Sequence, residues 1–204
     1  MPRQNRVLPD GQIVAIPQKG LLMGNRGCLH DHHGRIVRQH QRKAWITCLV
    51  EFKGRKRTLM SPGQYTELFF LDEATALAAG HRPCNECRPE RFKAFKEAWL
   101  KGNLPGQTKL LASELDATLH QERTAAERAS LRDCAQLPTG AMVRDDHGRF
   151  YLLEGGRLLP WSPTGYQSVE AMPASPLTLL TPPSTLNALR SGYVPQLHPS
   201  ATSQ

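Results

Sequence analysis

The stretch Asp72-Glu-Ala-Thr-Ala-Leu-Ala-Ala-Gly-His-Arg-Pro-Cys-Asn-Glu-Cys-Arg-Pro89 gives the clearest local structural signal in the chain. Asp72 is a good N-cap for residues 73–79, which are strong helix formers and end at Gly80. Pro89 suits the first turn of a second helix, where its missing N–H costs no hydrogen bond. Aromatic residues then recur at helical spacing, namely Phe92, Phe95 and Trp99. The sequence therefore predicts two helices joined by a Cys-x2-Cys turn.

Cys84 and Cys87 in this turn are candidate metal ligands, because paired thiolates at this spacing suit a tetrahedral zinc ion, Zn2+. Two sulfurs need two further ligands. Residues 44–52 predict a strand, which a Lys-Gly turn at 53–54 joins to a partner strand at 55–60. Alternation along the first strand places Cys48 on its apolar face, which we expect to meet the two helices. Cys48 is therefore the preferred third ligand.

The fourth ligand remains open between several residues and water. Cys28 and His30 follow the glycine-flanked turn Gly24-Asn-Arg-Gly27, which is able to fold them back towards the other cysteines. We prefer Cys28, with His30 as the alternative, and His32, His33 or water as further candidates. His81 is expected beside the site rather than as a ligand.

The segment 73–89 resembles the second half of the Ada metal-binding domain, the zinc module of bacterial alkylation-response proteins. The chain as a whole also resembles a wider set of bacterial proteins through Gly24-Asn-Arg-Gly27 and residues 65–71. The first resemblance implies an Ada-like zinc domain at about 44–99, a role with DNA, and a first cysteine pair one segment upstream. Cys48 matches the first member of that pair, but Phe52 stands where the second is expected.

This departure from the Ada pattern bears on DNA repair chemistry. In Ada domains, one zinc thiolate accepts a methyl group from a DNA phosphotriester, and the matching acceptor here is Cys48. Four thiolates give the zinc site a net charge of −2, whereas a histidine in place of one lowers this to −1 and makes the sulfur a poorer nucleophile. Methyl acceptance is therefore the less favoured alternative.

The net charge of +8 is unevenly distributed. Residues 1–60 hold 12 Lys and Arg against 3 Asp and Glu, whereas the remaining residues hold 14 against 15. A clustered basic excess is typical of a nucleic-acid partner, with DNA favoured over RNA. The candidate nucleic-acid-binding residues are Arg35, Arg38, Arg42, Lys43, Lys53, Arg55, Lys56 and Arg57.

Several function classes are disfavoured by the sequence. No apolar run approaches the roughly 20 residues of a membrane span, and five cysteines with a Cys-x2-Cys motif favour a reducing, cytoplasmic setting. A deaminase-like site is disfavoured because Cys48-Leu-Val-Glu51 has one residue more than the deaminase pattern. A zinc-dependent hydrolase or nuclease remains an alternative, with Cys48, His120 and Glu122 as speculative catalytic residues. A protein-interaction module is a further alternative.

The expected fold class is α+β, with three segments. Residues 1–102 are expected to form the Ada-like zinc domain with its basic N-terminal part. Residues 103–136 form a linker and a helix at 108–134, which contains Cys134 as an ordinary helix cysteine. Residues 137–204 form a small β-rich domain with a short helix at 184–190 and a loose C-terminal tail.

Overall fold

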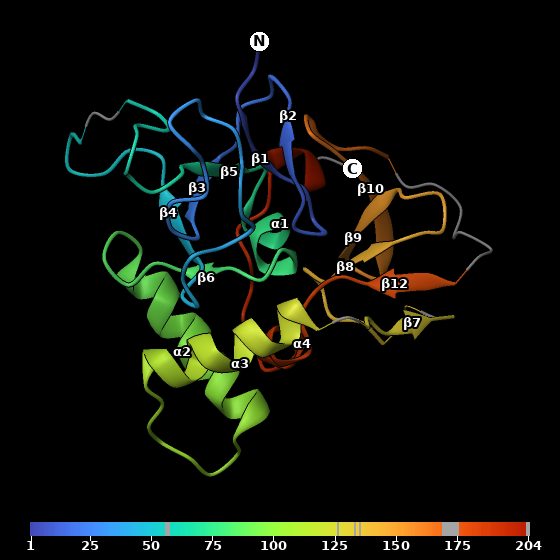
Figure 1. The fold of residues 1–204 in the computed structure, drawn as a ribbon. Helices are drawn as coiled ribbons and strands as arrows, with labels where there is room; N and C mark the ends of the chain where they lie inside the picture. The colour runs from blue at the N-terminus through green and yellow to red at the C-terminus, as the bar shows by residue number, and fades with distance from the viewer. Residues whose placement is uncertain (56–57, 126, 133, 135, 169–175, 203–204) are drawn as a thin grey trace.

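The computed structural model describes residues 1–55, 58–125, 127–132, 134, 136–168 and 176–202. It is a mixed α+β structure, as expected, and within these residues it has two six-stranded sheets (Figure 1). The N-terminal sheet has the strand order β2-β1-β5-β3-β4-β6, with parallel pairing between β1 and β5 and between β4 and β6. Its strands are β1 Gln4–Val7, β2 Ile13–Ala15, β3 Leu22–Asn25, β4 Ile46–Leu49, β5 Leu68–Phe70 and β6 Arg82–Pro83.

The C-terminal sheet is antiparallel and has the order β11-β10-β9-β8-β12-β7. Residues 137–204, which the sequence predicts to be β-rich, contain β8, β9, β10, β11 and β12 in their described part. Apolar residues on both faces of β9 explain its central position, because a strand covered on two sides needs no polar face. The bounds are β7 Ser130–Leu131, β8 Met142–Arg144, β9 Phe150–Glu154, β10 Arg157–Ser162, β11 Gly165–Tyr166 and β12 Leu177–Leu179.

Helix α1 (Glu73–Ala78) lies between the two sheets, and every one of its residues is buried (Figure 1). Ala76 packs in the apolar cluster of the N-terminal sheet, whereas Ala74 and Ala78 pack in a cluster with Met142 of the C-terminal sheet. Alanine side chains let both sheets approach the helix closely. As predicted, Asp72 caps the helix by accepting from the Thr75 N–H at 2.9 Å, and Gly80 follows it with a φ of +82°.

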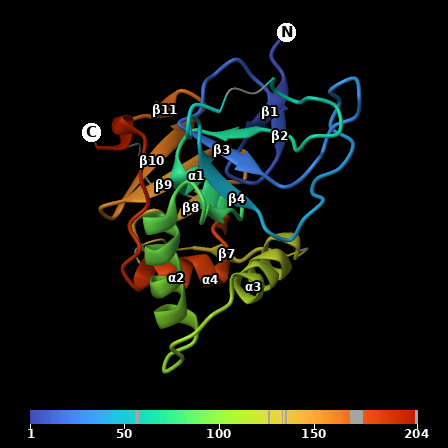
Figure 2. The same ribbon diagram turned by 90° about the vertical axis from the view of Figure 1, so that its left-hand side faces the viewer.

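The remaining helices gather on one side of both sheets (Figure 2). Helix α2 begins at Pro89, as predicted, and its aromatic residues pack in a cluster that also holds residues of α3, α4 and the C-terminal sheet. Two of the apolar clusters in the described part of the chain therefore cross the boundaries predicted at 102 and 136. The helix bounds are α2 Pro89–Asn103, α3 Ala112–Thr124 and α4 Pro183–Arg190, with a 3-10 turn, η1, at Pro199–Ala201.

Buried carboxylates at the start of α1 bind the C-terminal segment. Glu73 forms ion pairs with Arg88 at 2.9 Å and Arg91 at 2.6 Å, and it accepts hydrogen bonds from the Tyr193 hydroxyl and the Gln196 N–H. Asp72 accepts in turn from the Tyr166 hydroxyl and the His198 N–H, while its burial raises its pKa. Residues 193–202 are therefore not a loose tail, because Tyr193, Gln196 and His198 are bonded to these two carboxylates.

Two further sequence predictions are wrong. Residues 55–60 do not form a strand in the part that the structure describes, because β4 pairs instead with β3 and β6. The helix predicted at 108–134 is shorter, since Ala125 adopts an extended conformation and the chain continues to β7, which pairs with β12. Cys134 consequently lies beyond β7, buried in the apolar cluster of the helices, and not in a helix.

None of the helices in the described ranges has both the length and the apolar character required to cross a bilayer.

The first prediction concerns the buried ion pairs at α1. We expect Glu73→Ala to lower the free energy of unfolding by about 3–5 kcal/mol, because it leaves the Arg88 guanidinium buried without its partner. Arg88 has a side-chain exposure of 2%. Urea unfolding followed by circular dichroism measures the loss. The matched control is Glu97→Ala on the exposed face of α2, for which a change within about 0.5 kcal/mol is expected; equal effects of both variants contradict the prediction.

Candidate metal centre

Cys84 and Cys87 lie in the turn between β6 and α2, where Pro83 ends the strand and Pro89 begins the helix. The N–H of Cys84 donates to the Thr47 carbonyl at 2.9 Å, which continues the pairing of β6 with β4. The Glu86 N–H donates to the Cys84 sulfur at 3.4 Å, as expected for a tight Cys-x2-Cys turn. The sequence therefore places both sulfurs on one turn whose backbone is fixed by the sheet.

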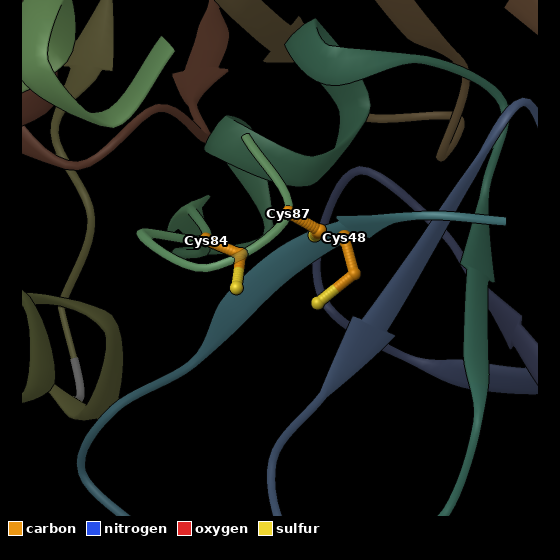
Figure 3. Close-up of side chains that lie close together, drawn as sticks. All are labelled: Cys48, Cys84 and Cys87. Carbon is orange, nitrogen blue, oxygen red and sulfur yellow. The ribbon is translucent and has the colours of Figure 1, made fainter. Parts of the chain in front are cut away.

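Cys48 lies on β4, directly beside this turn (Figure 3). Parallel pairing of Ile46 with Arg82 and of Thr47 with Pro83 brings the end of β4 to the cysteine turn. The Leu49 N–H donates to the Cys87 sulfur at 3.4 Å. The sulfur atoms of the three cysteines all lie within 4.8 Å of one another, a spacing that one metal ion can bridge. The prediction that these three residues meet is confirmed.

Crowding of the three thiols separates their acidities. The neighbouring Cys48 thiol and nearby backbone N–H donors lower the pKa of Cys84 to about 5. Proximity to Cys84 and burial raise the pKa of Cys48, and burial raises that of Cys87. The surroundings of Cys84 therefore favour its thiolate, the form that binds soft metals and acts as a nucleophile.

Trp45 fixes the start of β4, next to the cysteine strand. Its indole lies between two guanidinium groups, with Arg26 4.0 Å and Arg123 4.1 Å from its ring centroid. The indole N–H donates to the Arg42 carbonyl at 2.9 Å. Arg123 also donates to the carbonyls of Gly80 and Lys43, so α3 is bonded to the segments that precede β6 and β4. These contacts hold β4 and the end of α1 in register.

The other predicted ligands are not brought to the three cysteines. The Cys28 sulfur contacts the carbonyl of His30 at 3.6 Å. His30 is buried, with Nδ1 2.6 Å from the Thr66 hydroxyl and Nε2 3.2 Å from the Ser61 carbonyl, so both ring nitrogens have partners. His32 and His33 are exposed and stack on one another. Among the described residues the group therefore contains three cysteines and no fourth protein ligand.

A cavity of about 550 Å³ opens beside the three sulfurs and lies over the outer face of the N-terminal sheet. We call it the cysteine cavity. Alternation in the strands separates the two faces of the sheet: Leu22, Thr47 and Leu68 point into the protein core, whereas their neighbours Met23, Cys48 and Phe69 line the cavity. The loop after β4 forms the other side, through Val50, Phe52, Arg55, Leu59 and Tyr65.

Strand register orders the side chains on the floor of the cysteine cavity. Met23 pairs with Cys48 on one side and with Phe69 on the other, so these three residues form one row across the sheet. Asn25 pairs with Ile46 and, continuing the register of β3 and β5 by one residue, lies opposite Glu67. Polar groups of Asn25 and Glu67 therefore share a second row, next to the row that contains Cys48.

The basic residues predicted to bind nucleic acid lie on the N-terminal half of the molecule, and two of them line the cysteine cavity, Arg42 and Arg55. Arg55 pairs with Glu86 of the cysteine turn at 2.8 Å. Arg35 pairs with Asp31, also at 2.8 Å. The other described candidates are exposed: Arg38, Lys43 and Lys53. Lys56 and Arg57 lie outside the described residues.

His120 and Glu122, the speculative catalytic pair, do not line the cysteine cavity. His120 lies beside Arg123, with its ring 4.9 Å from that of His40. Glu122 accepts hydrogen bonds from the backbone N–H and the hydroxyl of Ser184 at 2.9 and 2.6 Å. Its carboxylate therefore joins α3 to the first turn of α4, which is a structural role.

Glu67 is the residue of the cavity that sequence reasoning missed. Its carboxylate is buried, with an exposed fraction of 3%, and it precedes the strand β5. The signal for it was a charged residue directly before the apolar run Leu68-Phe-Phe-Leu71, since a buried carboxylate beside such a run needs a specific partner.

Comparison of the chain with protein-family models, with curated proteins and with solved structures found no match. The likeness of segment 73–89 to the Ada metal-binding domain therefore stays a prediction that rests on its own residues.

The second prediction concerns His81, which is fully buried between the cysteine turn and α1. Its backbone N–H donates to the Ala76 carbonyl and ends the helix, while its Nε2 accepts from Arg26 at 3.2 Å. Burial and the charges of Arg26 and Arg123 hold the pKa of His81 well below its usual 6.5. The folded protein thus keeps this ring neutral, whereas the unfolded chain takes up a proton as the pH falls below that value.

We therefore expect His81 to make the fold less stable as the pH falls through about 6.5, by up to about 1.4 kcal/mol per pH unit. His81→Gln cannot titrate, so its deficit in unfolding free energy relative to the wild type should shrink between about pH 7.5 and about pH 5.5. Urea unfolding at both pH values measures this difference. His33→Gln, at an exposed histidine, is the control, and an equal deficit at both pH values contradicts the prediction.

Proposed function

We propose that Cys48, Cys84 and Cys87 bind one zinc ion and that the chain is a zinc-dependent enzyme acting on nucleic acid or a modified nucleotide. The observation that carries this proposal is the convergence of three sulfurs, within 4.8 Å, at the wall of a cavity of about 550 Å³. Three soft thiolates favour zinc over magnesium or calcium, which prefer oxygen ligands.

The position of the three cysteines favours a reactive zinc site over a purely structural one. Structural zinc sites are closed by four protein ligands, whereas catalytic sites have three and leave the fourth position to water or substrate. Here the described residues supply three sulfurs, and the side that they leave open is next to the cysteine cavity. A zinc ion supplies two things in such a site: it lowers the pKa of a bound water towards neutrality and polarises a bound oxygen.

Basic groups at the cavity support the proposed partner class. Arg42 and Arg55 line the cavity, Arg55 with Glu86 as its ion-pair partner, and Lys53 is exposed on the same loop as Arg55. Guanidinium and ammonium groups beside a ligand cavity favour a phosphate-bearing substrate. The excess of basic residues in 1–60 agrees with a polymer rather than with a single phosphate, because only a polymer contacts many of them at once.

A second candidate is a nucleic-acid-binding protein whose zinc only stabilises the fold. It is supported by the N–H to sulfur bonds of Glu86 and Leu49, which hold the cysteine turn against β4. Methyl transfer from a DNA phosphotriester to Cys48 is a less favoured alternative, since a three-thiolate zinc site has net charge −1 and a less reactive sulfur than a four-thiolate site.

The third prediction separates the two candidates through the metal. We expect the purified chain to bind one zinc ion, with Cys48→Ser, Cys84→Ser and Cys87→Ser each weakening metal binding more than about a hundredfold, since even outer-shell changes cost that much. With Co2+ in place of zinc, the visible spectrum should show thiolate coordination and should change on addition of imidazole, because imidazole enters the fourth position.

Cys28→Ser is the matched control, and it should keep both the metal and the imidazole response. A spectrum indifferent to imidazole, together with loss of metal in Cys28→Ser, would identify Cys28 as a fourth ligand. That result would overturn the enzyme proposal in favour of the structural zinc.

The fourth prediction concerns the partner. We expect the protein to bind short DNA or RNA, as a duplex or a single strand, with an affinity that falls steeply as the salt concentration rises. Replacing Arg42, Lys53 and Arg55 with Gln should lower the slope of log affinity against log salt concentration by about 2–3. The control neutralises Lys93, Lys101 and Lys109, which are exposed elsewhere and remove the same charge. Equal losses in the two triple variants would show a non-specific charge effect and contradict this rim as the binding surface.

A further inference from the structure

Glu67 places a buried carboxylate at the wall of the cysteine cavity. One oxygen of this carboxylate takes part in none of the contacts described so far. Its Oε2 accepts from the Met60 N–H at 2.8 Å. No arginine, lysine or histidine of the described residues forms an ion pair with it. A buried carboxylate without a cation is costly unless hydrogen-bond donors reach both oxygens, so a donor from a ligand in the cavity would complete its bonding.

The backbone that holds Glu67 is strained. Met60 is buried and has a φ of +56°, a conformation that non-glycine residues rarely adopt. This conformation directs its N–H at the Glu67 carboxylate. Strained residues persist where the surrounding structure fixes them and occur preferentially at functional sites, so Met60 is consistent with a carboxylate that is held in place for a ligand.

Asn25 supplies the complementary polar group in the same row of the sheet. Its side-chain oxygen accepts from the Gly27 N–H at 2.8 Å, so its amide nitrogen remains as the donor. Glu67 and Asn25 line the same cavity and lie opposite each other in the continued register of β3 and β5. One hydrogen-bond acceptor next to one donor is complementary to the edge of a nucleobase, where an N–H adjoins a ring nitrogen or a carbonyl oxygen.

The remaining walls suit a flat ring. Met23, Ile46 and Phe69 form an apolar floor, and Phe52 and Tyr65 line the loop side. The volume of about 550 Å³ lies in the range of small-molecule sites and accommodates a nucleoside. Aromatic side chains stack on bases of any sequence, and Arg42 and Arg55 of the same cavity offer cationic partners to phosphates attached to that base.

We propose that the cysteine cavity binds a nucleobase turned out of a nucleic-acid strand, with Glu67 accepting a hydrogen bond from the N–H of its edge and Asn25 donating to the neighbouring acceptor. This proposal rests on the proposed function for the nucleic-acid partner and names the part of that partner that enters the cavity. Enzymes that act on bases take them out of the stack in this way.

The test compares uridine with 3-methyluridine, which has the same ring but lacks the edge N–H. Isothermal titration of the zinc-loaded wild-type chain should show uridine binding about tenfold more tightly, because a good base contact discriminates by about this factor or more. In Glu67→Gln, the amide oxygen can still accept from Met60 while its nitrogen donates into the cavity. Uridine should then lose about tenfold in affinity, and 3-methyluridine should not.

A second variant keeps the test informative if Glu67→Gln fails to fold. Phe52 lies half-buried on a surface turn, so Phe52→Ala should fold and should weaken both nucleosides by about tenfold through lost stacking, with their ratio unchanged. Equal wild-type affinity for the two nucleosides, or no binding of either, would overturn the proposal.

Metal content and salt-dependent retention of nucleic acid are measured on the same samples. If the metal content and the nucleic-acid binding are normal while nucleosides fail to bind, only the base-binding proposal is contradicted. If the metal or the nucleic acid is not bound, the proposed function is contradicted together with the base-binding proposal.

Discussion

The fold depends on two carboxylates buried at the start of a helix that lies between two sheets. Asp72 and Glu73 together bond Arg88, Arg91, Tyr166, Tyr193 and the backbone of residues 196 and 198. An ionised carboxylate away from water is tolerated only with such a complete set of partners. Because those partners come from α2, the C-terminal sheet and the C-terminal segment, satisfying the carboxylates fixes the relative positions of all three. The chain thus forms one connected structure around α1.

The same constraint positions the three cysteines, because α1 leads directly into the cysteine turn. The helix ends at Gly80, His81 is buried next to Phe70, and β6 then pairs with β4. Trp45, held between two guanidinium groups, fixes the start of the facing strand, three residues before Cys48. The two segments that supply the sulfurs are therefore fixed by these contacts as well as by the bonds of the cysteines themselves. Such an arrangement lets the sulfurs face a cavity, since they are not needed to complete the core.

The parts of the fold and of the candidate site that could be predicted from the sequence are those that depend on local interactions. The cap at Asp72, the stop at Gly80 and the start at Pro89 are encoded within a few residues, so the predicted helices and turn are confirmed. Cys48 was found because strand alternation predicts the face of a side chain. The prediction of a partner strand at 55–60 was wrong because the pairing of β4 with β3 and β6 is non-local. The helix predicted at 108–134 was too long because Ser130 and Leu131, near its end, pair with β12 at the edge of the C-terminal sheet. The cavity was missed for the same reason, since it is formed by several strands and a loop that are distant in sequence. Glu67 stands out locally only as a charge before an apolar run, and its place at the cavity follows from the sheet.

The face of the sheet that carries the cysteines decides what the site is able to do. Thr47 points into the core and Cys48 points out of it, so adjacent residues on β4 serve stability and chemistry separately. In small zinc domains the metal replaces a hydrophobic core and must be enclosed by its ligands. Here the apolar clusters are formed by other residues, and the described part of the chain brings three sulfurs together without a fourth ligand. A metal in this position is not required to replace the core, which is why the adjoining cavity, with its buried carboxylate and basic rim, is the feature that a function for this protein must explain.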